Sequence, residues 1–284
     1  MRTQQEPRQV PGPVAELGEG ALWDTGSESL YWIDAPAGLV HRLAGDGQHA
    51  TYDAGRPVGC VVCRASGGLA LASGDGFIAL DTATGEVSTL AIAETGKPGN
   101  HMNDGACDRA GRFYAGSMAE DETPGHGTLY RLDPDRTVTE LVPGVGISNG
   151  IGWSPDERLM YYVDSLAYRV DVFDYDPASG EISGRRTLAR LGAGDVVPDG
   201  LAVDADGDVW VAVWGGGVVR RYTAAGELAG ELRLPAARVT SCAFGGPGLD
   251  QLYITTAAGP GSGAGALFTC PAGVTGQVSH PYRG

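Results

Sequence analysis

In four places in the chain, an acid or amide stands directly before a glycine at the head of an apolar, strand-like run. The four pairs are Glu19-Gly20, Asp104-Gly105, Asn149-Gly150 and Asp199-Gly200. They are separated by 85, 45 and 50 residues, so the first interval is about twice the later ones. Such spacing is typical of a repeat architecture, in which equivalent side chains point toward a shared axis. Oxygen ligands that converge on one point indicate a metal site.

The types of these side chains limit the ion. Carboxylates and amides without cysteine form a hard oxygen set, which suits Ca²⁺, Mg²⁺ or Mn²⁺ better than Zn²⁺ or Fe²⁺. Three protein ligands leave positions open for water and substrate, as in catalytic metal sites. The alternative is that Asp-Gly and Asn-Gly are ordinary turn dipeptides. The common register favours the metal, because turns need no shared partner whereas ligands do.

The elements that must position these residues are short strands. A unit of apolar strand, tight turn, aromatic or β-branched strand and further strand occurs six times, most clearly from Ala21, Ile151 and Leu201. The turns DTGSE, DRAGR, SPDER and DADGD supply the tight connections. Six units over 284 residues give about 47 residues each, enough for a four-stranded propeller blade. The sequence therefore predicts an all-β, six-bladed β-propeller, with one domain over residues 1–284.

Two details follow from this architecture. The sixth unit is short of strands, so an N-terminal segment near Gln9 to Leu17 is expected to complete it. The innermost strand of each blade lines the central channel, so the residues that enter these strands should lie at one mouth. The alternatives are a β-sandwich, which would show less self-similarity, and a parallel β-helix, which would show a much shorter period.

Composition excludes several classes of partner. The chain has 20 basic and 35 acidic residues and a net charge of −15, which argues against nucleic acid or an anionic membrane as a partner. No apolar run reaches the length of a membrane span, and the polar N-terminus lacks the apolar core of a signal peptide. We therefore expect a cytoplasmic protein. The five cysteines include Cys60 and Cys63 in a CxxC pattern, which we interpret as buried small hydrophobes, with redox or zinc chemistry as the alternative.

The ordered motifs GEGALW, NDGACDRAGRFYAGSMAED, ISNGIGWSPDERLMYYVDS, VPDGLAVDADGDVWVAVWGGG and TSCAFGG are similar to those of the senescence marker protein/regucalcin and gluconolactonase family of six-bladed propellers. The resemblance covers nearly the whole chain. It implies hydrolysis of a sugar or other small lactone with one divalent cation, Ca²⁺ first and Mg²⁺, Mn²⁺, Zn²⁺ or Fe²⁺ as alternatives. It places the cation on Glu19, Asn149 and Asp199, with Asp199 as the general base. Asn103 would reach the cation directly or through water.

The chain departs from the family at one position. Many members carry Arg two residues before the Asn of the NDG motif, where it grips substrate hydroxyls, and this chain has His101. An imidazole cannot make the bidentate contact of a guanidinium. His101 is either a substrate contact or a loop histidine without a role. The polar insertion 118–127 is either a plain surface loop or a lid, with Glu120 or Asp121 touching substrate.

The oxygen ligand set and this resemblance together predict a metal-dependent lactone hydrolase, in which the cation would polarise the carbonyl and Asp199 would take a proton from water. His101, Asn103 and Asp121 would orient the substrate. One alternative is an enzyme that acts on a non-sugar lactone, an ester or an intermediate of a specialised pathway. The other is a non-catalytic calcium-binding propeller. The expected partner is a small lactone, and the expected state is a monomer or small homo-oligomer.

Overall fold

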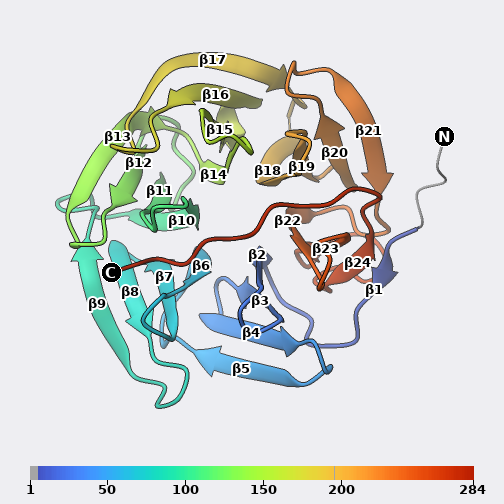
Figure 1. The fold of residues 1–284 in the computed structure, drawn as a ribbon, viewed down its shortest axis with the longest axis horizontal. Helices are drawn as coiled ribbons and strands as arrows, with labels where there is room; N and C mark the ends of the chain where they lie inside the picture. Colours follow the sequence, from blue (N-terminus) through green and yellow to red (C-terminus); the bar gives the residue numbers. More distant parts are fainter. Residues whose placement is uncertain (1–5, 195) are drawn as a thin grey trace.

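The computed structural model describes residues 6–194 and 196–284, which form six four-stranded antiparallel sheets around a central channel (Figure 1). The predicted six-bladed propeller is confirmed. Within the described residues the helical structure is a single 3₁₀ turn, η1 (Ser165–Ala167), and no helix there has the length and apolarity to cross a membrane. The first five residues of the polar N-terminus, which contribute to the cytoplasmic prediction, lie outside the described part of the chain.

The blades follow one another along the chain. Blades 1, 2 and 3 consist of β2 (Gly18–Asp24), β3 (Ser29–Asp34), β4 (Leu39–Ala44) and β5 (His49–Asp53); β6 (Cys60–Cys63), β7 (Leu69–Ser73), β8 (Gly76–Leu80) and β9 (Val87–Ile92); and β10 (Asn100–Cys107), β11 (Phe113–Ala119), β12 (Gly127–Leu132) and β13 (Val138–Val145). Blades 4, 5 and 6 consist of β14 (Ser148–Trp153), β15 (Leu159–Asp164), β16 (Arg169–Tyr175) and β17 (Ile182–Arg190); β18 (Val197–Val203), β19 (Val209–Trp214), β20 (Val218–Tyr222) and β21 (Leu228–Arg233); and β22 (Val239–Gly245), β23 (Gln251–Thr256), β24 (Phe268–Pro271) and β1 (Arg8–Gln9).

Burial changes across each blade from the channel to the rim. The second strands, such as β3 and β19, are almost fully buried because neighbouring blades pack on both of their faces. Their β-branched and aromatic residues suit a pleated surface that is covered on both sides. The outermost strands are far more exposed, as in β17. The core therefore lies between the blades, where rings such as Phe77 and Phe113 meet at 5.2 Å between centroids.

The ring of blades is closed by the N-terminal segment, as expected, but the closing strand begins and ends earlier than the predicted range. The strand that completes blade 6 is β1, in which Arg8 pairs with Thr269 and Gln9 with Phe268 of β24. The predicted segment, Gln9 to Leu17, contributes only its first residue to this strand. Beyond β1 the chain runs inward to β2, and Leu17 makes an isolated bridge to Ala257. Sequences from both ends of the chain thus share one sheet.

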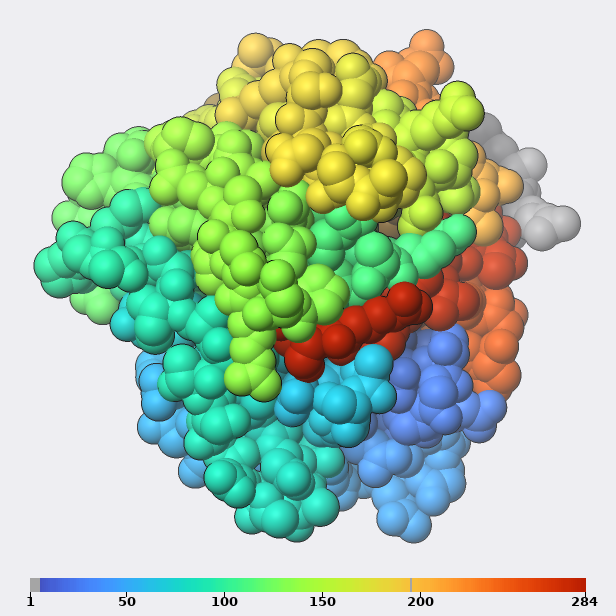
Figure 2. Space-filling model, turned by 60° about the vertical axis from the view of Figure 1, so that its left-hand side comes forward, coloured from blue at the N-terminus to red at the C-terminus, as the bar shows by residue number. Residues whose placement is uncertain are grey.

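Residues 274–284, which we call the C-terminal strap, cross one mouth of the channel (Figure 1). The strap forms hydrogen bonds with five of the six blades. It bonds blade 6 through Gly276 N to Leu249 O (2.8 Å) and blade 5 through Ala205 N to Thr275 O (2.9 Å). Gln277 Nε2 donates to Trp153 O of blade 4 at 3.0 Å. In the space-filling view, the end of the strap lies in red between the cyan and green segments of blades 2 and 3 (Figure 2).

At its far end the strap is held by a buried tyrosine. Tyr282 has no exposed surface, and its backbone pairs in both directions with Cys63 and Ala65 of blade 2. Its hydroxyl donates to Asp133 O of blade 3 at 3.0 Å. The ring lies 6.3 Å from the ring of Phe113. Tyr282 therefore joins the strap to the hydrophobic core between blades 2 and 3.

Candidate metal centre

The predicted ligands lie on the innermost strands of different blades. Glu19 is on β2, Asn103 on β10, Asn149 on β14 and Asp199 on β18. These strands neighbour one another around the channel, so β10 contacts β14, β14 contacts β18, and β2 closes the ring with β6 and β22 (Figure 1). Glu19, Asn149 and Asp199 occupy corresponding positions before a glycine, whereas Asn103 lies one residue before Asp104, their counterpart on β10. The topology thus brings together side chains that are as much as 180 residues apart in sequence.

These residues do not precede their strands in entry loops, as the sequence suggested, but lie at irregularities inside the strands. The ladder between inner and second strands shifts register between Glu19 and Leu22, between Met102 and Gly105, between Ser148 and Ile151, and between Pro198 and Leu201. An extra residue in one strand of an antiparallel pair is a β-bulge, which bends the strand and redirects a side chain. The acid-Gly and Asn-Gly pairs are therefore bulges that direct polar side chains in corresponding ways.

The glycines serve close approach between strands more than unusual backbone angles. A Cβ on Gly150 would lie 2.4 Å from Leu201 N of the next blade, and one on Gly200 would lie 2.5 Å from Ser241 Oγ. Gly20 alone among the four has a positive φ, of 58°. Gly150 and Gly200 thus let neighbouring inner strands approach closely.

The channel carboxylates Glu19, Asp104 and Asp199 are buried and have no basic side chain as a partner. Burial raises the pKa of Asp199 well above its usual value, and Asp104 raises it further, while the amide of Asn149 and the Gly200 N–H oppose this. Burial, then Asp199 and Asp104, raise the pKa of Glu19 in the same direction. Burial raises the pKa of Asp104 to about 6 against one hydrogen bond from Gly105 N. Among the described residues, none of the three forms a salt bridge.

The amide of Asn149 carries the clearest signal for a missing partner. Its Nδ2 donates to Ser165 Oγ at 3.1 Å, which fixes the orientation of the amide. Its Oδ1 is one of four buried side-chain atoms without a hydrogen-bond partner in the described part of the chain. A buried acceptor is rarely left unpaired in a folded protein, and an ion bound at this point would pair with the oxygen. Asn149 Oδ1 beside Asp199 thus fits the proposed cation.

The predicted ligand set is mixed rather than purely acidic, and it stays a prediction. No group of three or more His, Cys, Asp or Glu side chains within residues 6–194 and 196–284 gathers closely enough to hold an ion. The predicted set of Glu19, Asn149 and Asp199 contains only two such side chains and takes its third oxygen from an amide. Two carboxylates without a cation, together with one orphaned amide oxygen, fit a hard divalent ion.

Two residues of β10 lie beside this set. Asn103 Nδ2 donates to Ser148 O of blade 4 at 2.8 Å, which directs the amide toward the strand that carries Asn149. His101 lies two residues earlier and pairs in the ladder with Met118. Burial lowers the pKa of His101 although the charge of Glu120 raises it, so the ring is neutral near pH 7. Glu120 follows Ala119, which pairs with Asn100 in the same ladder, so Glu120 lies near His101.

The loop between β11 and β12 is tied to the start of β10. Glu120 N donates to Gly99 O at 2.8 Å, and Asn100 Nδ2 donates to His126 O at 2.8 Å. Glu120 and Asp121 are both exposed. Asp121 Oδ1 accepts from Thr123 N within its own loop at 3.0 Å, and hydrogen bonds with Thr123 lower its pKa. Glu120 therefore lies near His101, while the contacts of Asp121 are with its own loop.

A buried carboxylate that no sequence motif marked lies beneath these two segments. Glu94 is 3% exposed, and its Oε2 accepts from Asn100 Nδ2 at 3.0 Å. Its Oε1 accepts a hydrogen bond from Ser117 Oγ. Lys97 Nζ lies 3.7 Å from Oε2. Glu94 thus connects the segment before His101 to β11 and, through Asn100, to the loop that holds Glu120.

The cysteines agree with their interpretation as small hydrophobes. All five lie in the described part of the chain and are free thiols, and all except Cys63 are buried. Cys60 and Cys63 are the first and last residues of β6, so they point to opposite faces of the strand. Burial raises the pKa of both thiols. This arrangement suits neither a redox pair nor a zinc knuckle.

Comparison with known proteins adds to this geometry. Residues 17–258 match the sequence model of the SMP-30/Gluconolactonase/LRE-like region. Regucalcin of Bos taurus is 39% identical over 285 residues, which cover 94% of this chain and 95% of that protein. The crystal structure of a calcium-binding protein, regucalcin, from Agrobacterium tumefaciens superposes with a TM-score of 0.90 at 27% identity, covering 99% of this chain and 98% of the other.

A luciferin-regenerating enzyme superposes with a TM-score of 0.87 at 27% identity, covering 98% of this chain and 99% of that one. The family match extends from just before Glu19 to beyond the last inner strand, so it includes every predicted ligand. The chain belongs to the SMP-30/gluconolactonase/LRE-like family.

Proposed function

We propose that this protein is a divalent-metal-dependent hydrolase that opens a small lactone. The observation that carries the proposal is the orphaned, buried Oδ1 of Asn149 beside the buried carboxylate of Asp199. Family membership and the gluconolactonase in the family's description support the reaction class. The description of the Agrobacterium regucalcin as a calcium-binding protein supports Ca²⁺ as the ion, with Mg²⁺, Mn²⁺, Zn²⁺ and Fe²⁺ as alternatives.

Glu19, Asn149 and Asp199 would hold the cation, and Asn103 would reach it directly or through water. When bound, the cation supplies a Lewis acid for the lactone carbonyl and for water. Asp199 accepts the proton of the attacking water. The burial that raises its pKa makes the Asp199 carboxylate a stronger base than that of an exposed aspartate. His101, Asn103, Glu120 and Asp121 would bind and orient the substrate at the mouth.

His101 favours a substrate with fewer hydroxyl groups than a sugar lactone. A neutral imidazole offers one donor and one acceptor, whereas a guanidinium offers a rigid fork of donors. A non-sugar lactone, an ester or an intermediate of a specialised pathway is therefore the second candidate substrate. A calcium-binding propeller without catalysis is the remaining alternative, and we propose a monomer or small homo-oligomer for each.

Chelation and metal return test this function. Protein freed of metal with EDTA would be assayed on δ-gluconolactone and δ-valerolactone, alone and after addition of Ca²⁺, Mg²⁺, Mn²⁺, Zn²⁺ or Fe²⁺. Turnover should vanish with the metal and return with at least one ion. Asp199→Ala should lower kcat by roughly 10³-fold or more, because it removes both a ligand and the base. The exposed Asp135→Asn serves as the control. Full activity in excess chelator or in Asp199→Ala would refute the proposal, and calcium binding without turnover of any lactone or ester would favour the non-catalytic propeller.

A further inference from the structure

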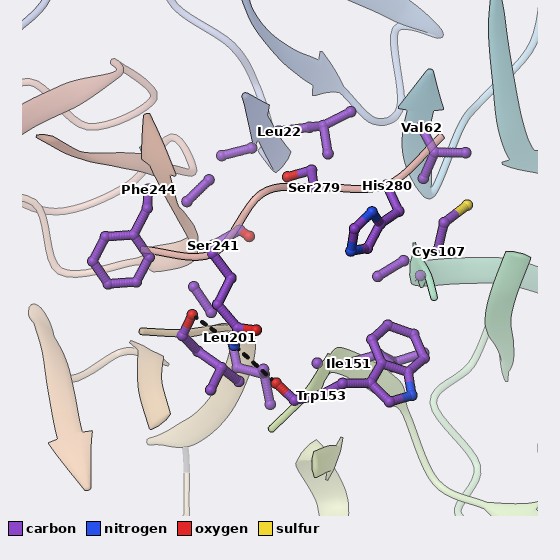
Figure 3. A pocket seen from close by; sticks show the side chains of 18 of the residues that line it. Leu22, Val62, Cys107, Ile151, Trp153, Leu201, Ser241, Phe244, Ser279 and His280 are labelled. Atoms are coloured by element: carbon purple, nitrogen blue, oxygen red, sulfur yellow. Dashed lines mark hydrogen bonds between the residues drawn. The ribbon is translucent and has the colours of Figure 1, made fainter. Parts of the chain in front are cut away.

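The two mouths of the channel offer a ligand different chemistry. The cavity beneath the C-terminal strap, of about 160 Å³, is lined by groups as different as Leu22, Phe244, Ser241 and His280 (Figure 3). Such a lining favours no single class of ligand. At the opposite mouth, which carries the predicted metal ligands, the guanidinium of Arg238 is more selective.

Arg238 lies immediately before β22, the inner strand of blade 6, at the end of the channel where the inner strands begin. The start of β22 runs between the strands that carry two of the predicted ligands. Thr240 Oγ1 donates to the carbonyl of Gly18, the residue before Glu19, at 2.6 Å. On its other side β22 contacts β18, which carries Asp199. Arg238 therefore belongs to the rim of the candidate metal centre.

The indole of Trp214 supports the guanidinium. Trp214 is the last residue of β19 and pairs in the ladder with Val197, two residues before Asp199. The Arg238 Cζ lies 5.0 Å from the centroid of the Trp214 ring. A guanidinium in this position is attracted to the face of the indole. The contact thus holds the Arg238 side chain over the end of β19, the strand that pairs with the Asp199 strand.

Backbone hydrogen bonds fix the loops around this pair. Arg238 Nη1 donates to Ala258 O at 2.8 Å. Gly217 N donates to Ala237 O at 2.9 Å, and Ala237 N donates to Pro260 O at 3.0 Å. These bonds join the loop after β19, the segment before β22 and the loop after β23. The guanidinium is therefore held in position before a ligand arrives, which lowers the cost of binding.

Within residues 6–194 and 196–284, Arg238 has no carboxylate partner. None of the ion pairs of this part of the chain includes it, although the sequence has 35 acidic residues against 20 basic ones. The side chain is exposed, and its hydrogen bond to Ala258 O uses one of the five N–H donors of a guanidinium. The remaining donors are enough for the two parallel hydrogen bonds that a carboxylate accepts.

We propose that Arg238 and Trp214 form a subsite for a carboxylate on the substrate, so that the enzyme opens a lactone whose ring carries an acidic substituent. The guanidinium donates two hydrogen bonds to this carboxylate, and the indole keeps the guanidinium in place. A carboxylate suits a single guanidinium, whereas a phosphate dianion would keep one negative charge unpaired. The inference rests on the proposed lactonase function, because it specifies the substrate class of the same site.

Two compounds of one shape test the subsite without turnover: cyclopentanecarboxylate and cyclopentanecarboxamide, titrated by calorimetry into calcium-saturated protein. The carboxylate should bind with a Kd about tenfold below that of the amide, since charge-assisted hydrogen bonds are stronger than neutral ones. Arg238→Gln should remove this preference, and Arg238→Lys should restore only part of it, because an ammonium group lacks the bidentate fork. Trp214→Leu should reduce the preference, and its melting curve shows whether it folds.

The matched control is Arg158→Gln, which makes the same change in net charge at the opposite mouth, where the Arg158 side chain is 83% exposed. It should retain the preference for the carboxylate. Equal affinities of the wild-type protein for the two compounds would overturn the proposal. Retention of the preference in Arg238→Gln would overturn it as well, because the calcium ion and not Arg238 would then bind the carboxylate.

Kinetics separates the subsite from the lactonase reaction. For γ-butyrolactone-γ-carboxylate and the matching γ-carboxamide, kcat/KM should favour the carboxylate by about tenfold, and Arg238→Gln should lose this ratio through KM, with kcat retained. Turnover of both compounds at a ratio that Arg238→Gln leaves unchanged would refute the subsite and support the lactonase. Carboxylate binding that depends on Arg238, without turnover of either compound, would support the subsite and count against the lactonase.

Discussion

The two mouths of the channel are formed by the same six inner strands, yet they are built from different chemistry. At the end where the strands begin, bulges carry the predicted ligands Glu19, Asn149 and Asp199, and side-chain hydrogen bonds hold the neighbouring loop. At the other end the lining mixes apolar side chains such as Leu22 and Ile151 with polar ones, and the strap crosses the mouth, held largely by backbone hydrogen bonds. A short strand can thus serve chemistry in its first half and stability in its second.

The two mouths also contribute differently to the stability of the protein. The mouth where Glu19, Asn149 and Asp199 lie, which we call the polar mouth, buries carboxylates without a paired cation. This burial lowers the free energy of unfolding of the metal-free protein. At the opposite mouth, which the C-terminal strap crosses, hydrogen bonds and the fully buried Tyr282 raise the free energy of unfolding. Mutations at the two ends should therefore affect different observables, and the following experiments test that separation.

Tyr282→Ala should have the largest effect on stability. It removes a fully buried ring and the hydrogen bond to Asp133 O, so we expect a loss of about 3 kcal/mol in the free energy of unfolding. Urea denaturation would measure it. The exposed Val278→Ala, also in the strap, should change stability by less than about 0.5 kcal/mol. Calcium affinity should stay within about twofold in both variants. A large loss of calcium affinity in Tyr282→Ala would show that the two mouths are not separate.

The free energy of unfolding should depend on pH through the buried carboxyl groups of the polar mouth. The folded-state pKa of Asp104, about 6, lies above its unfolded value, and those of Glu19 and Asp199 are raised as well. A raised carboxyl pKa contributes stability below the unfolded value, near pH 4, and that contribution is lost as pH rises through the folded value. Metal-free protein should therefore lose on the order of 2 kcal/mol from this source between pH 4.5 and pH 7.5.

Calcium should reverse this trend, because bound cation favours the charged carboxylates. The gain in unfolding free energy on saturation with Ca²⁺ should be larger at pH 7.5 than at pH 5, as measured by urea denaturation with calcium or EDTA. Asp199→Ala provides the comparison, since it should lose most of the gain at both pH values. A calcium effect that is independent of pH would show that these carboxylates are not at the ion site.

The sequence predicted the fold because its signals are local and repeated. Asp24, Asp108 and Asp204 each begin a predicted turn, and each carboxylate accepts hydrogen bonds from backbone N–H groups two to four residues later. A pattern that recurs in several blades can be recognised without any long-range information. The strap has no such periodicity, because its backbone pairs one residue at a time with loops of different blades. Its place in the fold could not be predicted from its own residues.

For the candidate site the sequence supplies residues whose role stays a prediction, and it did not reveal their local geometry. Acid-Gly and Asn-Gly pairs occur in both turns and bulges, and only the ladder between neighbouring strands distinguishes the two. Glu94 was missed for a different reason. Its partners Asn100 and Ser117 are 6 and 23 residues away and belong to different elements, so no spacing rule connects them.

Glu94→Gln tests whether the buried network around Glu94 positions the segment before His101 at the polar mouth. The amide keeps the shape of the side chain but weakens its bonds to Asn100 and Ser117, so the segment before His101 should become less well ordered. If the lactonase proposal holds, KM should rise by about tenfold, with kcat less affected and calcium affinity retained. Steady-state kinetics and calorimetry would separate these quantities.

A matched control distinguishes positioning from general loss of stability. Asp171 is 1% exposed and binds Arg169 and Arg185 at 2.7 Å each, in blade 4 and away from the predicted ligands. Asp171→Asn should lower the melting temperature without raising KM. If both variants raise KM equally, Glu94 acts only through stability. Glu94→Asp, which keeps the charge, should recover part of the lost affinity for substrate.

His101→Arg should have the smallest effect, confined to the choice of substrate. The native imidazole is neutral near pH 7, whereas arginine would place a charged fork of donors at the same point on β10. We expect the ratio of kcat/KM for δ-gluconolactone to that for δ-valerolactone to rise about threefold to tenfold, since sites that bond hydroxyls select for them. His101→Ala should alter this ratio more than it alters calcium affinity.

Glu120 limits how far that gain can go, because its charge already acts on the group at position 101. A guanidinium there would pair with Glu120 in part, and this pairing would withhold donors from the substrate. Adding Glu120→Gln to His101→Arg should therefore raise the gluconolactone preference further, while Glu120→Gln alone should leave it nearly unchanged. If the wild-type enzyme already prefers δ-gluconolactone strongly and none of these variants shifts the ratio, position 101 does not contact the substrate. The polar mouth would then select its substrate through Asn103, Arg238 and the metal ligands.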